Sequence, residues 1–368
     1  MSDLQTQSDR MFIHLGPQHP VNHGLWTLKI ETEGEYCVRA EALIGYIFRM
    51  IEKIGESRPY NEFVPINDRL CYAASMSWSG TYVMTIEKLM GLELNKRVQY
   101  IRVLMLELQR IASHLMWLSA YAADLGVLTM IFMAFREREF ILDVLEHVTG
   151  ARMMYNYFRV GGLWNDLPNG FIEDTYSLCD YLEARLIEYE AMCDDSRVFM
   201  LRSKGIGVLS TKDALNLGAT GPMLRASGVK ADLRRIEPYL VYDELDFKIP
   251  SSSEGDCYAR FRVRMDEMFE SIKIIRQALS QLPAEGEIFQ RPLRKLPKGD
   301  VYFRTADPRG ECAYYIVGNE HKIPYRVKIK SPAYTNLAIC EHLLRGVKVA
   351  DIAPIIASVD LCVGEMDR

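Results

Sequence analysis

Near its amino terminus the chain reads Met11-Phe-Ile-His-Leu-Gly-Pro-Gln-His-Pro-Val-Asn-His-Gly24, a stretch that holds three of the seven histidines of the sequence. Pro17 and Pro20 fix their own φ angles and push the residues before them toward extended geometry, so a helix is excluded here. The residues after it, Leu25 to Thr32, alternate apolar and polar side chains with period two and then meet Gly34. We therefore expect a rigid turn at the end of a hairpin strand, which can present an imidazole to a cavity.

His19 and His23 are the candidate site residues of this turn. Imidazole is the side chain that changes charge near neutral pH, and it is a common metal ligand. Both histidines are therefore candidates for proton donation or metal ligation. A loop histidine also commonly serves as a surface or hydrogen-bonding residue, so spacing alone leaves these roles open.

The composition is typical of a globular chain and gives no sign of a surface that binds nucleic acid. The 368 residues are enough for a large core and for more than one domain. The hydrophobic fraction is 49%, the charged fraction is 25%, and the net charge is −5 at pH 7. Because this charge is negative and no dense Lys/Arg stripe is visible, we do not expect a nucleic-acid partner.

The cysteines and the amino terminus indicate the compartment. None of the eight cysteines forms a C-x-x-C pair, so neither a zinc knuckle nor a cluster motif can be read from them. Reduced thiols fit this pattern best. The amino terminus has no apolar core followed by a small-residue cleavage site, so we expect the protein to stay on the cytoplasmic side.

One apolar segment, Leu115 to Phe135, carries only Asp124 as a charge over a span nearly long enough for a bilayer. A charged group at mid-membrane is costly, and Leu125-Gly126 resembles a break between two helices. We therefore expect two buried helices here and no membrane span.

Apolar periodicity predicts a helical middle with strands at both ends. Two strands are expected in the amino-terminal part, one over Leu25 to Thr32 and one over Arg39 to Gly45, and Tyr46 to Gly55 is expected to form a short helix. The longer expected helices are 67–90, 97–123, 128–149, 173–201 and 260–282. Beyond Pro292 and Pro297, we expect strands at 312–317 and 325–329 and a helix at 336–345. This is an α+β chain whose termini close together.

Within the 97–123 helix, Glu107 and Arg110 form an i,i+3 pair, which we interpret as a solvated pair contributing a few tenths of a kcal/mol. His114 falls on the same face and is expected to be structural. The glycines near 205–207 and 218–221 lack the frame of a phosphate-binding loop and are interpreted as turns.

Several short motifs occur together in one order along the chain. They are Gly16-Pro-Gln-His-Pro20 with His23-Gly24, Asp68-Arg-Leu70 with Tyr72, Glu107 to Leu115 with Asp124-Leu-Gly126, Gly150-Ala-Arg-Met153 with Arg159, Gly221-Pro-Met-Leu-Arg-Ala-Ser-Gly228 and Gly364-Glu-Met-Asp-Arg368. Through this set, which runs through essentially the whole chain, the sequence resembles the family of the quinone-site, 49-kDa-type subunit of respiratory complex I. The archaeal and photosynthetic relatives of that family are included in the resemblance, among them the corresponding subunit of F420H2 dehydrogenase.

The resemblance implies an architecture and a set of partners. That family is similar to the large subunit of nickel–iron hydrogenases, from which it has lost the metal. It implies three parts, namely a β-rich portion at 1–58 with the acceptor loop, a helical bundle at 59–290 and an α/β segment at 291–368 that folds back to the acceptor site. It also implies a small subunit carrying a [4Fe–4S] cluster, further peripheral-arm and membrane-arm subunits, and a peripheral location on the cytoplasmic face of a membrane or the equivalent organelle face. No cofactor is expected on this chain itself.

The resemblance also implies residue roles. His23 and Tyr72 are expected to hydrogen-bond the two ends of a quinone headgroup, with Asp124 paired to His23. Quinone reduction creates oxyanions that need protons. A phenol and an imidazolium are proton donors that can be re-protonated from an adjacent carboxylate. His19 is expected to order the loop. Four residues are expected near the partner's cluster: Arg49, Arg69, Met154 and Arg159.

The sequence departs from the family pattern at two positions. Met154 stands where many members carry a histidine, and Cys71 stands where aspartate is usual before Tyr72. Both departures concern the identity of the acceptor, which is ubiquinone, menaquinone, plastoquinone or methanophenazine. The electron donor, NAD(P)H or F420H2, binds elsewhere in the complex.

The resemblance to hydrogenases makes a geometric prediction. Arg69-Leu-Cys71-Tyr-Ala-Ala74 and Asp360-Leu-Cys362-Val-Gly-Glu365 align with the two metal-binding motifs of that class, and each keeps its first cysteine and lacks its second. Two thiolates remain where four are required, so no metal is expected. Cys362 is expected to lie against the acceptor site and close to Cys71.

Three hypotheses about the function remain. The first is an electron-transfer subunit that builds the acceptor site of a proton-pumping membrane complex. The second is an active hydrogenase large subunit, and the third is a structural scaffold for a neighbouring redox subunit. Metal analysis distinguishes the second hypothesis from the first. Loss of turnover on substitution of Tyr72 or His23 in an assembled complex distinguishes the first from the third.

Overall fold

The computed structural model describes residues 10–17, 23–291 and 297–368. The expectation that His19 orders the acceptor loop falls outside these residues. No helix in the described part of the chain is long and apolar enough to cross a bilayer.

The amino-terminal strands form a three-stranded antiparallel sheet. β1 (Arg10–Leu15) pairs with β2 (Thr27–Glu33), which pairs with β3 (Tyr36–Leu43). In β2, Leu28 and Ile30 are buried while Lys29 is exposed, as the period-two pattern predicts. The expected hairpin strand is therefore confirmed, and the second strand lies a few residues earlier than the expected 39–45.

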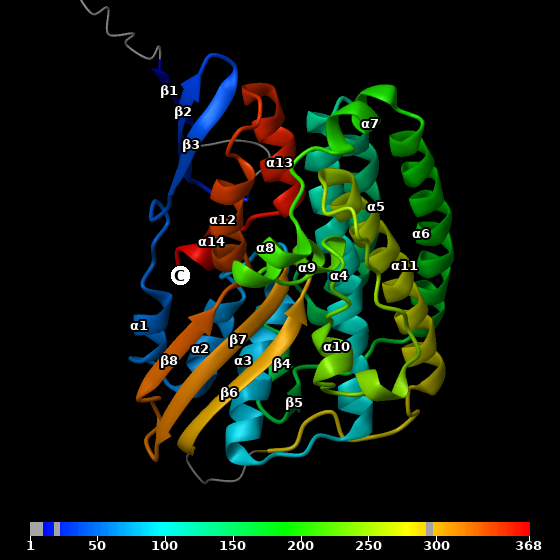
Figure 1. The fold of residues 1–368 in the computed structure, drawn as a ribbon. Coiled ribbons are helices and arrows are strands. Elements are labelled where there is room, and N and C mark those ends of the chain that lie inside the picture. Colours follow the sequence, from blue (N-terminus) through cyan, green and yellow to red (C-terminus); the bar gives the residue numbers. More distant parts are fainter. Residues whose placement is uncertain (1–9, 18–22, 292–296) are drawn as a thin grey trace, which may run out of the picture.

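A bundle of long helices forms the other half of the molecule (Figure 1). Its members are α4 (Lys96–Asp124), α5 (Met130–Thr149), α6 (Phe171–Asp194) and α11 (Cys257–Gln281). α4 packs against both α5 and α11. Three of the four helices match the expected bounds within three residues, because each carries a continuous apolar stripe. The expected break after Asp124 is also present, since Gly126 has a φ of +94° between α4 and α5.

Four expected helices differ from the structure. One of them, expected at 336–345, is found at Pro332–Leu343. The segment 173–201 is two helices, α6 and α7 (Arg197–Ser203), because Ser196 caps the second one by accepting a hydrogen bond from Phe199 N at 3.3 Å. The first long helix is α3 (Ser75–Met90), preceded by α2 (Tyr60–Asn67) and a turn. The helix expected from Tyr46 is only α1 (Ile51–Gly55). Its upstream residues are held by Asp367, whose carboxylate accepts hydrogen bonds from Gly45 N and Ile47 N at 2.8 and 3.0 Å.

A second antiparallel sheet, β6-β7-β8, packs on α3. Its strands are β6 (Lys298–Asp307), β7 (Gly310–Asn319) and β8 (Arg326–Lys330). β7 contains the strand expected at 312–317, and β8 overlaps the strand expected at 325–329, whereas β6 was not predicted. The short elements between the bundle and this sheet are β4 (Phe158–Arg159), β5 (Gly162–Leu163), α8 (Thr211–Asn216), α9 (Pro222–Ala226) and α10 (Leu233–Ile236).

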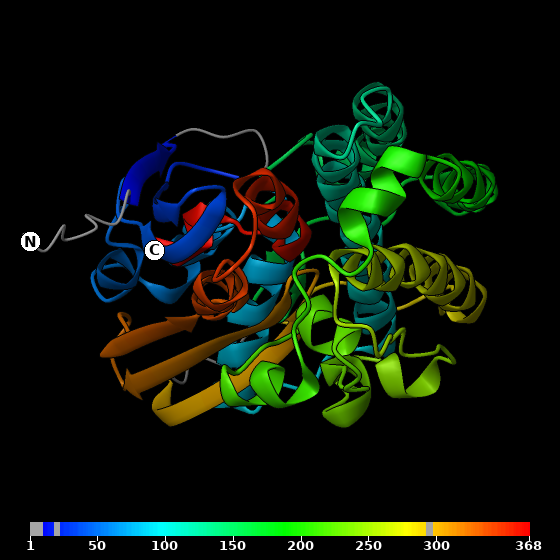
Figure 2. The ribbon, with the colours of Figure 1, turned by 45° about the horizontal axis from the view of Figure 1, so that its top comes forward.

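The carboxy-terminal helices lie between the amino-terminal sheet and the bundle (Figure 2). They are α12 (Pro332–Leu343), α13 (Ile352–Val359) and α14 (Val363–Met366). Backbone hydrogen bonds join the two ends of the chain, including Cys37 N to Val347 O at 2.8 Å. Ala42 N also donates to Glu341 Oε1 at 2.9 Å. The fold is α+β with chain ends that meet, as predicted, while the division at residues 58 and 290 stays a prediction.

Candidate acceptor site

His23 is held against the carboxy-terminal segment by its backbone. His23 N donates to Leu361 O at 3.3 Å, and Val363 N donates to His23 O at 2.8 Å. The buried side chain places Nε2 3.4 Å from Asp360 Oδ1. Burial alone would raise the pKa of Asp360, but Arg309 and the hydrogen bond from His23 outweigh it and hold that pKa below its usual range. The imidazole therefore lies beside a buried, ionised carboxylate.

Tyr72 comes from the turn between α2 and α3 and lies directly against His23. The two ring centroids are 5.9 Å apart, with the planes at 85°. Burial, followed by the neighbouring Cys362 and Cys71, raises the pKa of the Tyr72 hydroxyl. The phenol is therefore protonated at neutral pH and is a hydrogen-bond and proton donor.

His23 also lines a cavity of about 380 Å³. Asp124, at the end of α4, also lines it, and the remaining wall is largely apolar. The other lining residues are Met116, Ser119, Ala120, Ala123, Leu128, Ile131 and Phe135. Tyr72 is not among the described residues that line this cavity. The carboxylate that lies within ion-pair distance of His23 is that of Asp360. The pairing of His23 with Asp124 therefore stays a prediction.

Cys71 and Cys362 lie together although they are nearly three hundred positions apart. Their sulfurs and a carboxylate oxygen of Glu365 lie within 4.8 Å of one another, and all three residues are buried. The sequence predicts this meeting of the two cysteines. Burial, followed by a hydrogen bond with Cys362, raises the pKa of the Cys71 thiol, and the pKa of Glu365 is also raised well above its usual value. A nickel centre of the hydrogenase type needs four thiolates, and the described residues bring only two cysteine sulfurs together here, so this set does not fit such a centre.

Arg309, in the turn between β6 and β7, connects these groups and was not predicted from the sequence. Its guanidinium donates to Cys71 Sγ at 3.4 Å through Nη1 and to Asp360 Oδ1 at 3.2 Å through Nη2. Its backbone N donates to Asp307 Oδ2 at 3.0 Å. The only signal was the Asp307-Pro-Arg-Gly310 sequence, which is typical of a hairpin turn but carries no indication of what the arginine contacts.

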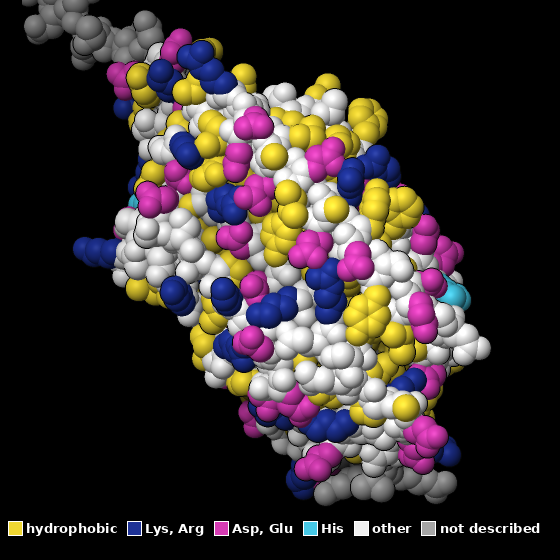
Figure 3. Space-filling view, turned by 90° about the vertical axis from the view of Figure 1, so that its right-hand side faces the viewer, with side chains coloured by type: hydrophobic (Ala, Val, Ile, Leu, Met, Phe, Trp, Pro, Cys, Tyr) yellow, Lys and Arg dark blue, Asp and Glu magenta, His cyan; other side chains and the backbone are white. Residues whose placement is uncertain are grey.

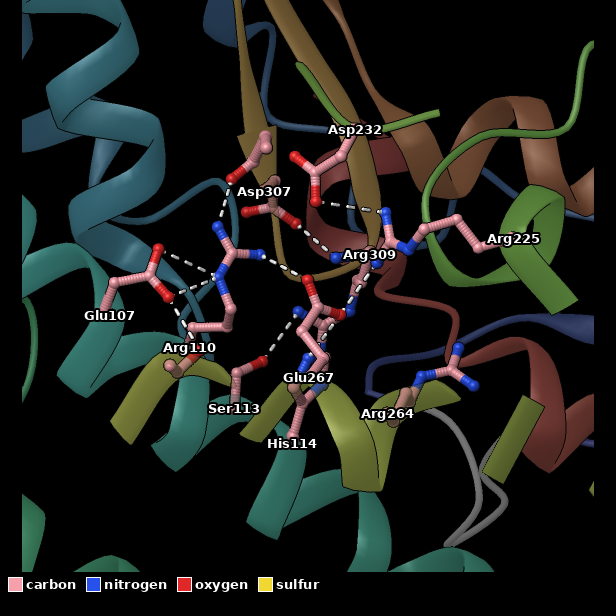
Figure 4. Close-up of polar contacts among 12 residues, drawn as sticks. Glu107, Arg110, Ser113, His114, Arg225, Asp232, Arg264, Glu267, Asp307 and Arg309 are labelled. Atoms are coloured by element: carbon pink, nitrogen blue, oxygen red, sulfur yellow. Dashed lines mark hydrogen bonds and ion pairs between the residues drawn. The ribbon is translucent and has the colours of Figure 1, made fainter. Parts of the chain in front are cut away.

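Glu107 and Arg110 are not the solvated pair expected from their spacing but part of a buried ionic network (Figure 4). Arg234 Nη1 lies 3.1 Å from Glu107 Oε1, and its Nη2 lies 2.9 Å from Glu267 Oε1. Arg225 Nη2 donates to Glu267 Oε2 at 2.8 Å. The expected i,i+3 contact is present, but that spacing does not reveal that α11 covers this face of α4.

His114 belongs to the same network and has the structural role expected of it. It is fully buried, and its Nε2 lies 3.2 Å from Glu267 Oε2. Burial lowers the pKa of His114 despite that carboxylate.

The four residues expected near a partner's cluster form two neighbouring groups. Arg49 donates to Arg69 O and to Gly364 O, each at 2.8 Å, and so joins the end of α2 to the carboxy terminus. Met154 and Arg159 lie on the segment between α5 and β5, where Arg159 Nη1 donates to Asn156 Oδ1 at 2.6 Å. Their proximity to a cluster stays a prediction.

Asp68 joins the segment that carries Met154 and Arg159 to the start of the turn that carries Tyr72. Asn156 N donates to Asp68 Oδ2 at 2.5 Å. Burial raises the pKa of Asp68 to about 6, against hydrogen bonds from Ser79 and Asn156 and the charges of Arg69 and Arg159. Asp68 therefore joins the segment that carries Arg159 to the turn that carries Tyr72.

The arrangement of His23, Tyr72 and the carboxy-terminal segment can be compared with known proteins. The family model described as "Respiratory-chain NADH dehydrogenase, 49 Kd subunit" matches residues 124–295 and 287–368. The H subunit of the chloroplastic NAD(P)H-quinone oxidoreductase of Chlorokybus atmophyticus is 42% identical over the full length of both chains. The chain belongs to this 49 Kd subunit family.

Other relatives agree with this membership. The H subunit of the NAD(P)H-quinone oxidoreductase of Nostoc punctiforme is 43% identical over the whole of both chains. A chain from the membrane-bound sulfane sulfur reductase, an archaeal respiratory membrane complex, superposes with a TM-score of 0.94 at 33% identity and covers 99% of this chain and 100% of its own. As a member of the 49 Kd family, this chain is a subunit of an oxidoreductase complex.

Proposed function

We propose that this chain forms the acceptor site of a membrane-associated, proton-pumping oxidoreductase, where a quinone or quinone-like acceptor is reduced together with a cluster-bearing small subunit. The observation that carries the proposal is the contact of His23 with Tyr72 beside Asp360, which unites three segments remote in sequence. A scaffold does not need two proton donors and an ionised carboxylate in one buried place.

The geometry suits the chemistry of quinone reduction. Two electrons and two protons convert a quinone to a quinol, so the site must supply hydrogen-bond donors to both oxygens and then protons. Tyr72 offers a protonated phenol, and His23 offers an imidazole whose Nε2 lies 3.4 Å from the Asp360 carboxylate. Asp124, from the facing wall of the cavity, is proposed to assist His23, and Cys362 contributes to the wall on the side of Tyr72.

The electrons are proposed to arrive from a [4Fe–4S] cluster on the small subunit, since no cofactor is assigned to this chain. Arg49, Arg69, Met154 and Arg159 border the Tyr72 turn and are proposed to face that cluster, where positive charge stabilises the reduced form. The face that carries α6 has interspersed acidic, basic and hydrophobic side chains, with no continuous basic patch among its described residues (Figure 3). This face therefore offers no basic surface of the kind that binds nucleic acid.

The names of the relatives indicate which electron donor and which electron acceptor to test first. Those at about 42% identity are called NAD(P)H-quinone oxidoreductases, whereas the structural neighbour at 33% is called a sulfane sulfur reductase. We therefore infer NAD(P)H and a quinone as the first pair to assay, with F420H2 and methanophenazine as the second. The complex is proposed to lie peripherally on the cytoplasmic face of a membrane or the equivalent organelle face.

The hydrogenase alternative makes a distinct prediction about metal. It requires stoichiometric nickel on this chain, whereas the described residues offer only two of the four thiolates, those of Cys71 and Cys362. Elemental analysis of the purified complex is expected to find no nickel above trace, and stoichiometric nickel would establish the alternative.

The test of the proposed function is Tyr72→Phe in the assembled complex. The substitution removes one proton donor and leaves the ring, so acceptor turnover is expected to fall about a hundredfold, the usual size of a general-acid contribution. Tyr302→Phe on β6, an exposed tyrosine whose hydroxyl donates to Glu311, is the matched control and should leave turnover unchanged. A Tyr72→Phe complex that reduces every acceptor at the wild-type rate would refute the proposal.

A further inference from the structure

Glu365 is a fully buried carboxyl group that the proposed function does not use. Ser331 Oγ and Ala333 N both donate to Glu365 Oε1, each at 3.0 Å. Among the residues that the structure describes, Oε2 has no hydrogen-bond partner. A carboxylate placed in this way leaves one buried oxygen unsatisfied, while a carboxylic acid carries its proton on that oxygen.

The groups that face Glu365 favour the neutral acid. Among the described residues they include Cys71 from the turn after α2, Cys362 from the segment before α14, Asp307 from the end of β6 and Arg309 from the turn after it. Cys312 and Tyr314 of β7 also interact with Glu365. Burial has the largest effect on the pKa of Glu365, and Cys71 and Asp307 raise it further against the opposing charge of Arg309. Arg309 is already paired with Asp360 at 3.2 Å, so it does not neutralise a second carboxylate fully.

Glu365 shares its neighbours with Tyr72. Its carboxylate oxygen lies within 4.8 Å of the sulfurs of Cys71 and Cys362. After burial, these same two thiols have the largest effects on the pKa of the Tyr72 hydroxyl. The two thiols that lie beside Glu365 therefore also act on the phenol that the proposed function places against the acceptor.

A second buried carboxyl group near Glu365 is that of Asp307, whose charge raises the pKa of Glu365. Asp307 lines a cavity of about 190 Å³ between the 218–221 turn and the β6–β7 turn, whose rim includes the exposed Ile236. Asp307 is 2% exposed, and its Oδ1 has no hydrogen-bond partner within the described ranges. Burial raises the pKa of Asp307 to about 6, so this carboxyl exchanges protons near neutral pH.

The wall of this cavity is built by a close approach of two backbones. A Cβ on Gly221 would lie 2.4 Å from Gly310 Cα and 2.6 Å from Arg309 O. Gly221 also has a φ of +62°, a conformation that side chains with a Cβ rarely adopt. The cavity therefore lies directly behind the turn that carries Arg309.

We propose that Glu365 is the buried proton donor of the acceptor site and that its proton is replaced from solvent through Asp307. The proposal rests on the proposed function, which supplies the quinone-type acceptor and the electrons. For each acceptor, two electrons from the partner's cluster and two protons yield the quinol. Glu365 releases one proton by cleavage of its O–H bond, becomes a carboxylate, and regains a proton from Asp307, which takes one from water in the cavity.

The test uses the assembled complex with Glu365→Gln, which keeps an acceptor for Ser331 and Ala333 but cannot release a proton. Acceptor turnover is expected to fall about a hundredfold with the acceptor KM unchanged. Glu365→Asp, which retains an acid, should restore part of the rate. Glu341→Gln is the matched control, because Glu341 also accepts a backbone hydrogen bond from a distant segment but lies outside the site, and it should keep the wild-type rate.

Two further readouts separate a proton donor from a structural residue. The infrared spectrum of the wild-type complex at neutral pH should contain a carbonyl stretch of a protonated carboxylic acid that Glu365→Gln removes. Asp307→Asn should lower turnover most above pH 6, where proton supply from water limits the rate, and it serves as the deciding variant if Glu365→Gln does not assemble.

The outcomes distinguish this proposal from the proposed function. Wild-type turnover in Glu365→Gln alongside a strong loss in Tyr72→Phe would overturn the role of Glu365 and leave the acceptor site in place. Wild-type turnover in both variants would overturn the proposed function itself. An unchanged pH profile in Asp307→Asn, or an infrared spectrum that Glu365→Gln does not change, would also overturn the proton route.

Discussion

Arg309 and Asp360 are the residues on which the geometry of the site depends most. Both are almost completely inaccessible to solvent, and their charges compensate each other across 3.2 Å. Removing either partner would leave an uncompensated buried charge, which is strongly destabilising. Because Asp360 also lies against His23, this one ion pair positions the imidazole and, through Arg309, the Cys71 thiol.

Met154 offers a test of the proposed neighbourhood of the cluster. A thioether cannot take up a proton, so the reduction potential of the partner's cluster is expected to change little with pH. Met154→His should introduce a pH dependence that approaches about 59 mV per pH unit. The backbone favours this change, since Met154 has a φ of +57° and histidine adopts such angles more readily than most residues.

Redox titration of the cluster across pH measures this effect. Met192→His on α6, which lies on the far side of the bundle, is the control and should leave the slope at its wild-type value. A wild-type slope that already corresponds to one proton per electron would contradict the expectation for Met154.

The site was only partly predictable residue by residue. Tyr72 and His23 were found through local motifs, and the two cysteines through alignment with metal-binding motifs. Asp307, Arg309 and Asp360 were missed as partners of these residues. Their hydrogen bonds connect positions that are distant in sequence, and no local pattern encodes which buried arginine meets which buried acid.

At the scale of elements, the long helices were predictable and the short ones were not. α4, α5 and α11 carry apolar stripes repeated over many turns, which local periodicity detects. α13 is buried on nearly every side and shows no polar face, so periodicity cannot locate it. β6 was missed because its exposed and buried residues do not alternate regularly.

The ionic network that joins α4 to α11 should contribute strongly to stability. Glu267→Gln removes the carboxylate that Arg110, Arg225 and Arg234 share, and it is expected to lower the free energy of unfolding by about 3 to 5 kcal/mol. Glu320→Gln, which breaks the exposed pair with Lys298, should cost at most about 1 kcal/mol. Urea unfolding followed by circular dichroism measures both values.

The same network predicts how stability depends on pH. Burial raises the pKa of Glu107 and Glu267, but the surrounding arginines outweigh it and hold both pKa values below the usual 4.5. A carboxylate with a depressed pKa stabilises the fold above its unfolded pKa, and this contribution is lost as the pH falls toward the folded pKa. The wild type should therefore lose stability below about pH 4.5, and Glu267→Gln should lose less over the same range. Equal losses in the two proteins would contradict this account of the network.

At the scale of the whole molecule, the site exists only because the chain closes on itself. His23 is hydrogen-bonded on both sides to residues 361–363, and Asp367 holds the loop before α1 through Gly45 and Ile47. The Tyr72 turn and the β6–β7 turn meet the same carboxy-terminal segment from other directions. The sequence indicated that the ends meet, and the structure adds which residues join them.

The measurement that tests the proposed acceptor site most directly is a structure of the assembled complex with its acceptor bound. We predict a headgroup within hydrogen-bond distance of both Tyr72 Oη and the His23 ring, with Cys362 in the adjoining wall. A headgroup bound instead in the cavity lined by Asp307, or on the exposed face of α6, with the His23–Tyr72 contact intact and unoccupied, would contradict it.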